Sequence, residues 1–357
     1  MHDDITLQRL GWSTQLEETF VPHGEQGLVP GRVAVQHRGA FGVYTEDGEV
    51  QAEVAGRLRH EAESAEDLPA AGDWVALDSG GRPGETTAII QAVLPRRTKL
   101  SRKVAWLETG EQIIAANVDV VLVLTALNGD LNLRRLERYL TTVWESGAQP
   151  GIVLTKADLA DDLDGAVLAA ETVGIAVPVH VVSSVTGLGV EEVEAYAAGD
   201  RTIALLGSSG VGKSTLLNRL VGEELLAVQE VRADGRGRHT TTRRELVLLP
   251  GGGLVLDTPG MRELQLWDAA SGIDAAFEDV EELARACRFT DCAHEREPGC
   301  AVLAAVDDGR LELDRLRNWR KLQRELRSLA LKQDQRARSE ERRKRRVQAR
   351  SFRKVKW

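Results

Sequence analysis

Hydrophobic and polar positions along the first part of the chain follow a β pattern. Between Gly31 and Arg97, short stretches rich in β-branched and aromatic residues are separated by Gly, Asp and Pro turn signals. These stretches are Arg32–Gln36, Phe41–Thr45, Val50–Val54, Trp74–Leu77 and Ala88–Val93. They predict a small β-barrel of the kind that includes OB folds, many of which bind RNA, although a purely structural β-domain fits the pattern nearly as well.

From about Val118 the pattern changes to apolar strands that alternate with helical segments. Val120–Leu124 is continuously apolar, and residues 131–144 carry apolar positions at helical spacing. Further apolar strands follow at Gly151–Leu154, Val177–Val182, Thr202–Leu206, Glu245–Leu249 and Leu254–Leu256. This alternation predicts an α/β fold with a doubly wound, mostly parallel sheet, which binds its ligands at the carboxyl ends of the strands.

After about Trp267 the pattern becomes helical. One apolar stripe at helical spacing consists of Leu316, Trp319, Leu322, Leu326 and Leu329. Beyond Lys332 the stripe fades into Arg-rich sequence. We therefore expect an OB-like barrel in residues 1–100, the α/β domain in residues 101–267, a helical domain in residues 268–331 and a basic tail in residues 332–357.

Charge is distributed unevenly along the 357 residues. Residues 311–357 contain 18 Lys and Arg against 6 Asp and Glu, a formal charge of +12; because the whole chain carries −9, residues 1–310 carry −21. Such a tail either binds nucleic acid or an acidic surface, or is a solvated extension. No apolar run approaches the roughly 18 residues that span a bilayer, and no apolar signal segment opens the chain, so we expect a cytoplasmic protein without membrane contact.

A phosphate-binding loop is predicted at Gly207-x4-Gly212-Lys213-Ser214, between the apolar strand Thr202–Leu206 and a helical segment. The expected phosphate ligands are Gly207, Ser208, Ser209, Gly210, Val211, Gly212, Lys213, Ser214 and Thr215. Backbone N–H groups of such a loop surround the phosphates, the lysine reaches the β- and γ-phosphates, and the serine hydroxyl binds Mg²⁺.

Two further segments supply candidate magnesium and γ-phosphate contacts. Asp257 ends an apolar strand and begins an Asp-x-x-Gly motif, so its carboxylate is expected near Mg²⁺ and the Gly260 amide near the γ-phosphate. Residues 232–242 are rich in Gly and Arg and are predicted to form a loop that GTP orders. We favour Thr241 as its magnesium ligand, although spacing does not separate it from Thr240 or Thr242.

Base recognition is predicted at Thr155-Lys156-Ala157-Asp158, at the end of the strand Gly151–Leu154. A carboxylate there can accept hydrogen bonds from both N1–H and the exocyclic amino group of guanine, which adenine does not offer as a pair. Ser183 and Ser184, after the strand Val177–Val182, are expected to supply a backbone contact to the guanine oxygen. The base-reading segment precedes the phosphate loop, the reverse of an ordinary GTPase, so the sequence predicts a circular permutation.

All three cysteines of the chain lie close together, in the pattern Cys287-x4-Cys292-x-His294-x5-Cys300. Three thiolates and one imidazole form a complete tetrahedral Zn²⁺ set with no position left for water. We therefore expect one structural zinc ion that stabilises a small helical domain.

These motifs together resemble the ribosome-small-subunit-dependent GTPase family (RsgA). The resemblance covers nearly the whole chain, because Gly72-Asp73-Trp74-Val75, Leu94-Pro95-Arg96-Arg97-Thr98 and Gly237-Arg238-His239-Thr240-Thr241-Thr242 match it as well. It implies a late factor in maturation of the small ribosomal subunit, whose low GTPase activity that particle stimulates. It also implies that the barrel, the zinc domain and the tail contact ribosomal RNA.

Two positions depart from common GTPase motifs. Met261 stands where many GTPases have a glutamine that orients water. The resemblance indicates His239 as the catalytic group instead. The alternative is that His239 only binds RNA or caps local structure. Thr155 stands where asparagine is usual, which predicts reduced guanine affinity with selectivity kept by Asp158.

Three functions follow from the sequence. The first is a GTP hydrolase, expected as a monomer, that acts on the small ribosomal subunit. The second is an RNA-binding module in which GTP is a slow switch ligand. The third is a permuted GTPase of large-subunit assembly, for which the zinc spacing and the OB-like domain would be unexpected together.

Overall fold

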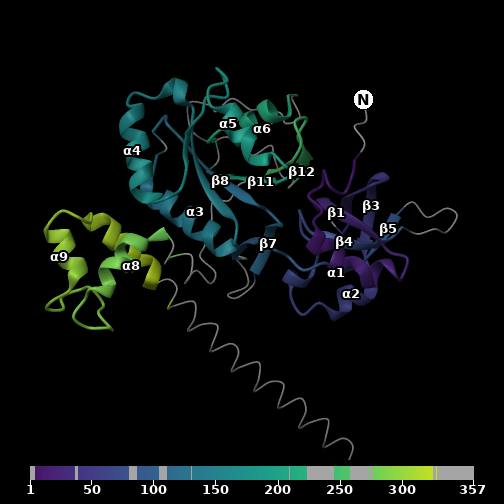
Figure 1. Ribbon diagram of the computed structural model, residues 1–357, viewed down its shortest axis with the longest axis horizontal. Helices are drawn as coiled ribbons and strands as arrows, with labels where there is room; N and C mark the ends of the chain where they lie inside the picture. The colour runs from purple at the N-terminus through teal and green to yellow at the C-terminus, as the bar shows by residue number, and fades with distance from the viewer. Residues whose placement is uncertain are drawn as a thin grey trace, which may run out of the picture.

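The computed structural model describes residues 5–36, 39–79, 87–103, 111–129, 131–208, 210–222, 245–257, 273, 276–324 and 327. Figure 1 shows a β-barrel at one end of the molecule, a sheet flanked by helices in the middle, and a small helical unit at the other end. Along the part of the chain that is described, no helix is both long enough and apolar enough to cross a membrane.

The barrel is built from five strands, which confirms the prediction. They are β1 (Val29–Gln36), β2 (Phe41–Thr45), β3 (Gly48–Val54), β4 (Trp74–Asp78) and β5 (Thr87–Val93), with the helix α2 (Gly56–Glu61) and the 3-10 helix η1 (Ala65–Asp67) between β3 and β4. They pair in the order β1-β2-β3-β5-β4, and β4 pairs back to β1 at Arg32↔Trp74, which closes the barrel. Alternate residues such as Val33, Val43 and Ile90 fill its interior.

The central α/β domain contains the predicted parallel sheet. Its strands are β8 (Val120–Ala126), β9 (Gln149–Thr155), β10 (Val179–Val181), β11 (Thr202–Gly207), β12 (Glu245–Leu248) and β13 (Leu254–Asp257). The order β10-β9-β8-β11-β13 is parallel throughout, and β12 runs antiparallel to β13. The carboxyl ends of the five parallel strands therefore meet at one edge of the sheet.

Helices cover both faces of this sheet. They are α3 (Leu133–Ser146), α4 (Leu163–Val173), α5 (Val190–Glu194) and α6 (Lys213–Val221), with the 3-10 helices η2 (Ala157–Leu159) and η3 (Ala195–Ala197). Alternation along β8 explains the two layers: Val121 and Val123 join the core beneath α3 and α4, whereas Val120, Leu122 and Leu124 join the core beneath α5 and α6.

The barrel and the α/β domain share one sheet and one core, which the sequence did not predict. Strand β12 pairs with β1 at Glu245↔Val35, so the strands of both units form one continuous 11-stranded sheet. The helix α1 (Thr14–Gly24) and the hairpin of β6 (Lys99–Lys103) and β7 (Glu111–Ala116) contribute Leu16, Leu100 and Ile114 to the core that spans this junction. A single apolar cluster contains Phe20, Trp74 and Leu136, from α1, β4 and α3.

The C-terminal unit, residues 276–324, contains α8 (Glu278–Arg285), α9 (Ala301–Asp307) and a helix over residues 313–324. Its core includes Phe277 and Val302 together with Leu316, Trp319 and Leu322 of the predicted apolar stripe. Leu326, Leu329 and the tail 332–357 lie outside the described residues. In Figure 1 this unit lies beside α3, far from the barrel.

Candidate functional site

The predicted phosphate loop connects the end of β11 to the start of α6. A Cβ at Gly207 would lie 2.7 Å from the Leu124 carbonyl oxygen, so the loop leaves the sheet too close to its neighbour for any side chain. Gly210 and Gly212 have φ angles of +78° and +105°, which favour glycine. Three glycines thus allow the backbone to turn sharply before α6, whose N-terminal end faces the loop.

Lys213 lies inside this loop. Only 9% of the residue is exposed, and Nζ donates to the carbonyl oxygens of Gly207 (2.7 Å) and Ser208 (2.8 Å). Ser214 and Thr215 follow in the first turn of α6 and are half-buried. The predicted residue Ser209 lies outside the described residues.

Asp257 ends β13, the strand next to β11, as the sequence predicted. It is 3% exposed, and its Oδ1 has no hydrogen-bond partner within the described part of the chain. Burial raises the pKa of this carboxyl, while the positive charge of Lys213 acts in the opposite direction. A buried carboxylate oxygen without a partner beside a phosphate loop fits a divalent cation, which prefers oxygen ligands. The other predicted residues of this region, His239, Thr241, Gly260 and Met261, lie outside the described residues.

The two predicted base-reading segments meet at the ends of β9 and β10. Lys156 has a left-handed backbone, with a φ angle of 58°, and Ala157 and Asp158 follow in η2. The Ser183 hydroxyl donates to Asp158 Oδ1 at 2.5 Å and accepts a hydrogen bond from the Thr186 amide at 3.2 Å. Ser183 is buried and the neighbouring Ser184 is half-buried. The serine thus orients the Asp158 carboxylate.

Thr155 has a contact that the sequence did not indicate. Its hydroxyl lies 2.6 Å from the carbonyl oxygen of Val211 in the phosphate loop and 3.2 Å from that of Thr125 at the end of β8. Because a hydroxyl has one proton, it donates to one of these carbonyls at a time. Thr155 therefore links the base-reading segment directly to the phosphate loop, across 56 residues of sequence.

Cys287, Cys292, His294 and Cys300 come together in the C-terminal unit, where their ligand atoms all lie within 4.8 Å of one another. Cys287 Sγ lies 3.8 Å from Cys300 Sγ and 3.5 Å from His294 Nδ1, and His294 Nδ1 lies 3.4 Å from Cys300 Sγ. A tetrahedral zinc ion with Zn–S bonds of about 2.3 Å requires neighbouring sulfurs about 3.8 Å apart. The four residues therefore fit a tetrahedral metal ion.

Backbone geometry holds these four side chains in place. His294 has a left-handed backbone, with a φ angle of 57°, and its carbonyl oxygen accepts a hydrogen bond from Arg320. Cys300 caps α9 by accepting from the Leu303 amide at 3.4 Å. Burial acts to raise the pKa of the Cys287 thiol, but hydrogen bonds from the backbone amides of Val302 and Ala301 and with the Cys300 and Cys292 thiols together lower it, whereas burial raises the pKa of the Cys292 thiol to about 11. A lowered thiol pKa favours the thiolate that binds metal.

Comparison with known proteins agrees with this geometry. The family model described as RsgA GTPase matches residues 93–267, and the model described as 50S ribosome-binding GTPase matches residues 202–336. The small ribosomal subunit biogenesis GTPase RsgA of Streptomyces coelicolor is 46% identical over 94% of this chain and 90% of its own length. RsgA 2 of Lactiplantibacillus plantarum is 45% identical over 90% of both chains.

Solved structures support the same fold. The crystal structure of YjeQ from Thermotoga maritima matches with a TM-score of 0.62 and 26% identity, over 84% of this chain and 98% of that chain. YloQ, described as a circularly permuted GTPase, matches with a TM-score of 0.57 and 24% identity over 84% of this chain and 96% of that chain, and this likeness supports the fold alone. On the extent and identity of these matches, the chain belongs to the RsgA GTPase family.

Proposed function

We propose that this chain hydrolyses GTP during biogenesis of the small ribosomal subunit. One observation carries the proposal: Thr155 links the base-reading segment to the phosphate loop, in a sheet that presents both at its carboxyl edge. The names of the relatives, small ribosomal subunit biogenesis GTPases, supply the particle. These names do not favour the alternatives of an RNA-binding module with GTP as a slow switch, or of large-subunit assembly.

The residue roles in this proposal follow the geometry. Asp158 accepts hydrogen bonds from guanine while Ser183 holds its carboxylate, and the Lys156 stem lies over the base. Lys213 exchanges its two loop carbonyls for phosphate oxygens. Ser214 and Asp257 hold Mg²⁺, which when bound neutralises charge on the β- and γ-phosphates. The remaining proposed GTP contacts are Thr155, Ala157, Ser184, residues 207–212, Thr215 and Gly260.

Roles outside the described residues remain part of the proposal. His239 orients the attacking water or stabilises charge once the ribosome fixes its segment, and Thr241 completes the magnesium shell. The metal of the C-terminal unit is a structural zinc ion. Residues 1–100, 101–267, 268–331 and 332–357 act as RNA-binding barrel, GTPase domain, zinc domain and basic tail. The protein works as a monomer in the cytoplasm, where it binds the small ribosomal subunit.

The first experiment measures GTP turnover by the purified protein alone and with small or large ribosomal subunits, with ATP as the control nucleotide. Stimulation confined to GTP and the small subunit is the expected result. Failure to hydrolyse GTP with small subunits present would refute the proposal. Loss of turnover in His239→Ala, with GTP and subunit binding retained, would separate hydrolysis from simple binding.

A base swap tests the role of Asp158 directly. In xanthine a carbonyl replaces the exocyclic amino group of guanine, so the amide of Asp158→Asn can donate where the wild-type carboxylate accepts. We expect this variant to lose affinity for GTP and to gain affinity for XTP, with turnover following the base. Asp161→Asn, an exposed aspartate of the same segment, is the matched control and should leave base preference unchanged.

A further inference from the structure

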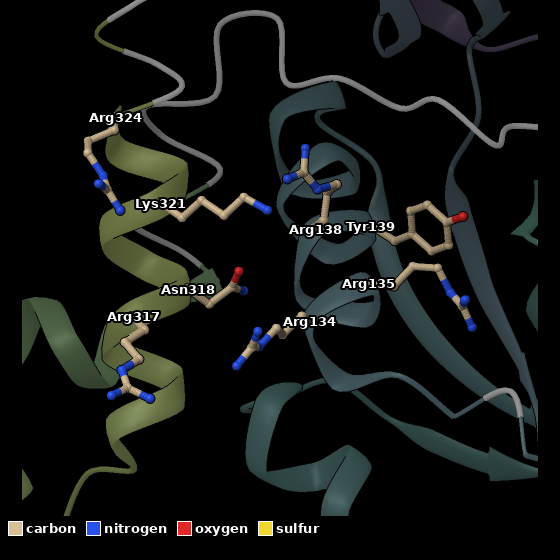
Figure 2. Close-up of a pocket in the computed structure, with 8 residues that line it drawn as sticks. All are labelled: Arg134, Arg135, Arg138, Tyr139, Arg317, Asn318, Lys321 and Arg324. Carbon is tan, nitrogen blue, oxygen red and sulfur yellow. The ribbon is translucent and has the colours of Figure 1, made fainter.

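A pocket of about 580 Å³ lies between α3 of the α/β domain and the helix over residues 313–324 of the C-terminal unit. Six cations line it: Arg134, Arg135 and Arg138 from α3, and Arg317, Lys321 and Arg324 from the other helix. Its two other lining residues are a tyrosine and an asparagine, so none is acidic. Figure 2 shows Lys321 extending toward α3 and Arg134 extending toward the facing helix. We call this pocket the cationic groove.

The spacing of these cations follows the helical repeat. Arg317, Lys321 and Arg324 lie at positions i, i+4 and i+7, on the side of their helix away from the buried residues Leu316 and Leu322. Over seven residues this stripe covers about 10 Å of helix axis, which is longer than one phosphate group. On α3, Arg134 and Arg138 are likewise one turn apart. Two stripes of positive charge therefore border the groove.

Two carboxylates, Glu137 and Asp314, contact residues that line the groove. Glu137 belongs to α3, but its two oxygens accept from Arg315 (2.8 Å) and from Asn318, so it is already engaged. Asp314 pairs with Arg134 at 3.0 Å and with Arg317 at 3.2 Å, and all three side chains are about 60% exposed, so solvent screens both pairs. The lining itself thus holds six cations and no acid, in a chain whose first 310 residues carry −21.

We infer that the cationic groove binds the sugar-phosphate backbone of RNA, and that the RNA contacts the α/β domain and the C-terminal unit at once. The side chains suit phosphates rather than bases, because Tyr139, the one aromatic residue of the lining, is buried and offers no stacking face. They suit an acidic protein less well, because protein interfaces have apolar or aromatic residues at their centre. The inference rests on the proposed function for the identity of the RNA-containing partner.

The test compares the double variant Arg138→Ala/Lys321→Ala with the wild-type protein. Arg310→Ala is the matched control, because Arg310 is an exposed cation of the same unit that pairs with Asp308 and lies outside the groove. Affinity for small ribosomal subunits is measured at several salt concentrations. We expect the double variant to lose affinity about tenfold near 0.1 M salt and to reduce the slope of log K against log salt by about 1.5, since two phosphate contacts are removed.

Two more readouts separate a lost contact from a damaged protein. The double variant should have the same GTP turnover in the absence of ribosomes as the wild type, and the same content of bound metal, because neither residue lies in the nucleotide or metal site. A photoreactive phenylalanine analogue in place of Lys321 should crosslink to ribosomal RNA on the subunit. Crosslinking to ribosomal proteins alone, or unchanged affinity and slope in the double variant, would overturn the inference.

The failure of the inference is distinguishable from that of the proposed function. Polyuridylate binding by the isolated protein is measured in parallel for all three proteins. If the wild type does not bind small subunits, the proposed function fails. Even then, polyuridylate binding that is weaker in the double variant than in the wild type and in Arg310→Ala supports RNA binding by the groove. If all three proteins bind polyuridylate and subunits equally, the groove does not bind RNA, whatever the turnover measurements show.

Discussion

The barrel and the C-terminal unit are both attached to the α/β domain, but by different means. The barrel shares backbone hydrogen bonds through β1 and β12 and shares an apolar core with the α/β domain. The C-terminal unit has its own core, to which α3 adds the half-buried Trp144, and it docks through a small set of buried polar side chains. The first junction is continuous in both strand pairing and apolar core. The second joins two units that have separate cores.

At the barrel junction the buried charges are spread over many partners. The guanidinium of Arg32 donates to the carbonyl oxygens of Leu10, Gly72 (3.3 Å) and Asn117 (3.0 Å), and burial lowers its pKa to about 10. Gly72 has a φ angle of +89°, and a Cβ there would lie 2.1 Å from the carbonyl oxygen of Ala116. The barrel is therefore packed backbone to backbone against β7.

At the C-terminal junction the buried polar contacts converge on Glu137 of α3, which accepts from Arg315 and Asn318. Arg315 donates to Glu137 Oε1 at 2.8 Å, to both oxygens of Asp279 at 2.6 and 2.7 Å, and to the Ala276 carbonyl at 3.0 Å. Burial raises the pKa of Glu137, and the positive charge of Arg315 opposes this. Since Asp279 and Ala276 belong to the C-terminal unit itself, only Glu137 connects this arginine to α3.

Removal of the proposed zinc ion with a chelator should have the largest effect, confined to the C-terminal unit. Metal ligation contributes roughly 10 kcal/mol to the folding of small zinc-stapled units, so the C-terminal unit should unfold. Hydrogen exchange should rise over residues 276–324 and stay unchanged in the barrel, with GTP affinity within about twofold of the loaded protein. Simultaneous loss of protection in the barrel would contradict the contrast between the two junctions.

Asp73→Ala should destabilise the barrel and the α/β domain together. Asp73 is fully buried, and its two oxygens accept from Arg96 at 2.7 Å each, so truncation leaves a charged guanidinium without its carboxylate. We expect a loss of about 3–5 kcal/mol in the free energy of unfolding. Urea unfolding, followed by tryptophan fluorescence, measures it. The double variant Asp73→Ala/Arg96→Met should recover part of the loss, because the orphaned charge is gone.

Glu137→Ala should have a smaller and more local effect. Arg315 keeps Asp279 as a partner, so we expect a loss of about 2 kcal/mol, mostly in the docking of the C-terminal unit. Limited proteolysis should cut between the α/β domain and that unit faster than in the wild type, while urea unfolding of the barrel stays the same. Glu145→Ala, a change at a half-buried acid of the same helix, is the control. Equal acceleration in both variants would argue against a specific role for Glu137.

Asp257 is a third buried acid. Asp73 and Glu137 each accept hydrogen bonds from an arginine, whereas Asp257 Oδ1 has no hydrogen-bond partner within the described residues. Its pKa is raised, so as pH rises from the ordinary value of 3.8 the unfolded chain releases its proton first, and stability is lost until pH passes the raised pKa. Asp257→Asn should therefore be about 1 kcal/mol more stable than the wild type at pH 7, with the advantage disappearing below pH 3.8. Thermal unfolding against pH, without Mg²⁺ and nucleotide, measures this difference.

Local signals in the sequence account for most of the fold and for the residues that meet at the candidate nucleotide site. Apolar runs located the barrel strands and the parallel strands, and spacing located Lys213, Asp158 and the cysteine cluster. The sequence did not predict the two junctions, because their contacts join residues that are far apart along the chain. Arg32 donates to a carbonyl 85 residues away, and Glu137 accepts from an arginine 178 residues away. A glutamate between arginines on an amphipathic helix has the pattern of a solvated charge, and only the tertiary fold shows that it is buried.

The smallest effect concerns the exposed ion pair at the C-terminal junction. Arg134 and Asp314 connect the same two helices as Glu137 and Arg315, at a similar distance of 3.0 Å, but their side chains are 62% and 59% exposed. Because of solvent screening and side-chain entropy, such a pair contributes less than about 0.5 kcal/mol to the docking of the C-terminal unit. Arg134→Ala should therefore not accelerate the proteolytic cut that Glu137→Ala accelerates. Because the variant still removes one cation from the groove, it should weaken RNA binding. Docking and RNA binding would then depend on different side chains of one helix, the buried Glu137 and the exposed Arg134.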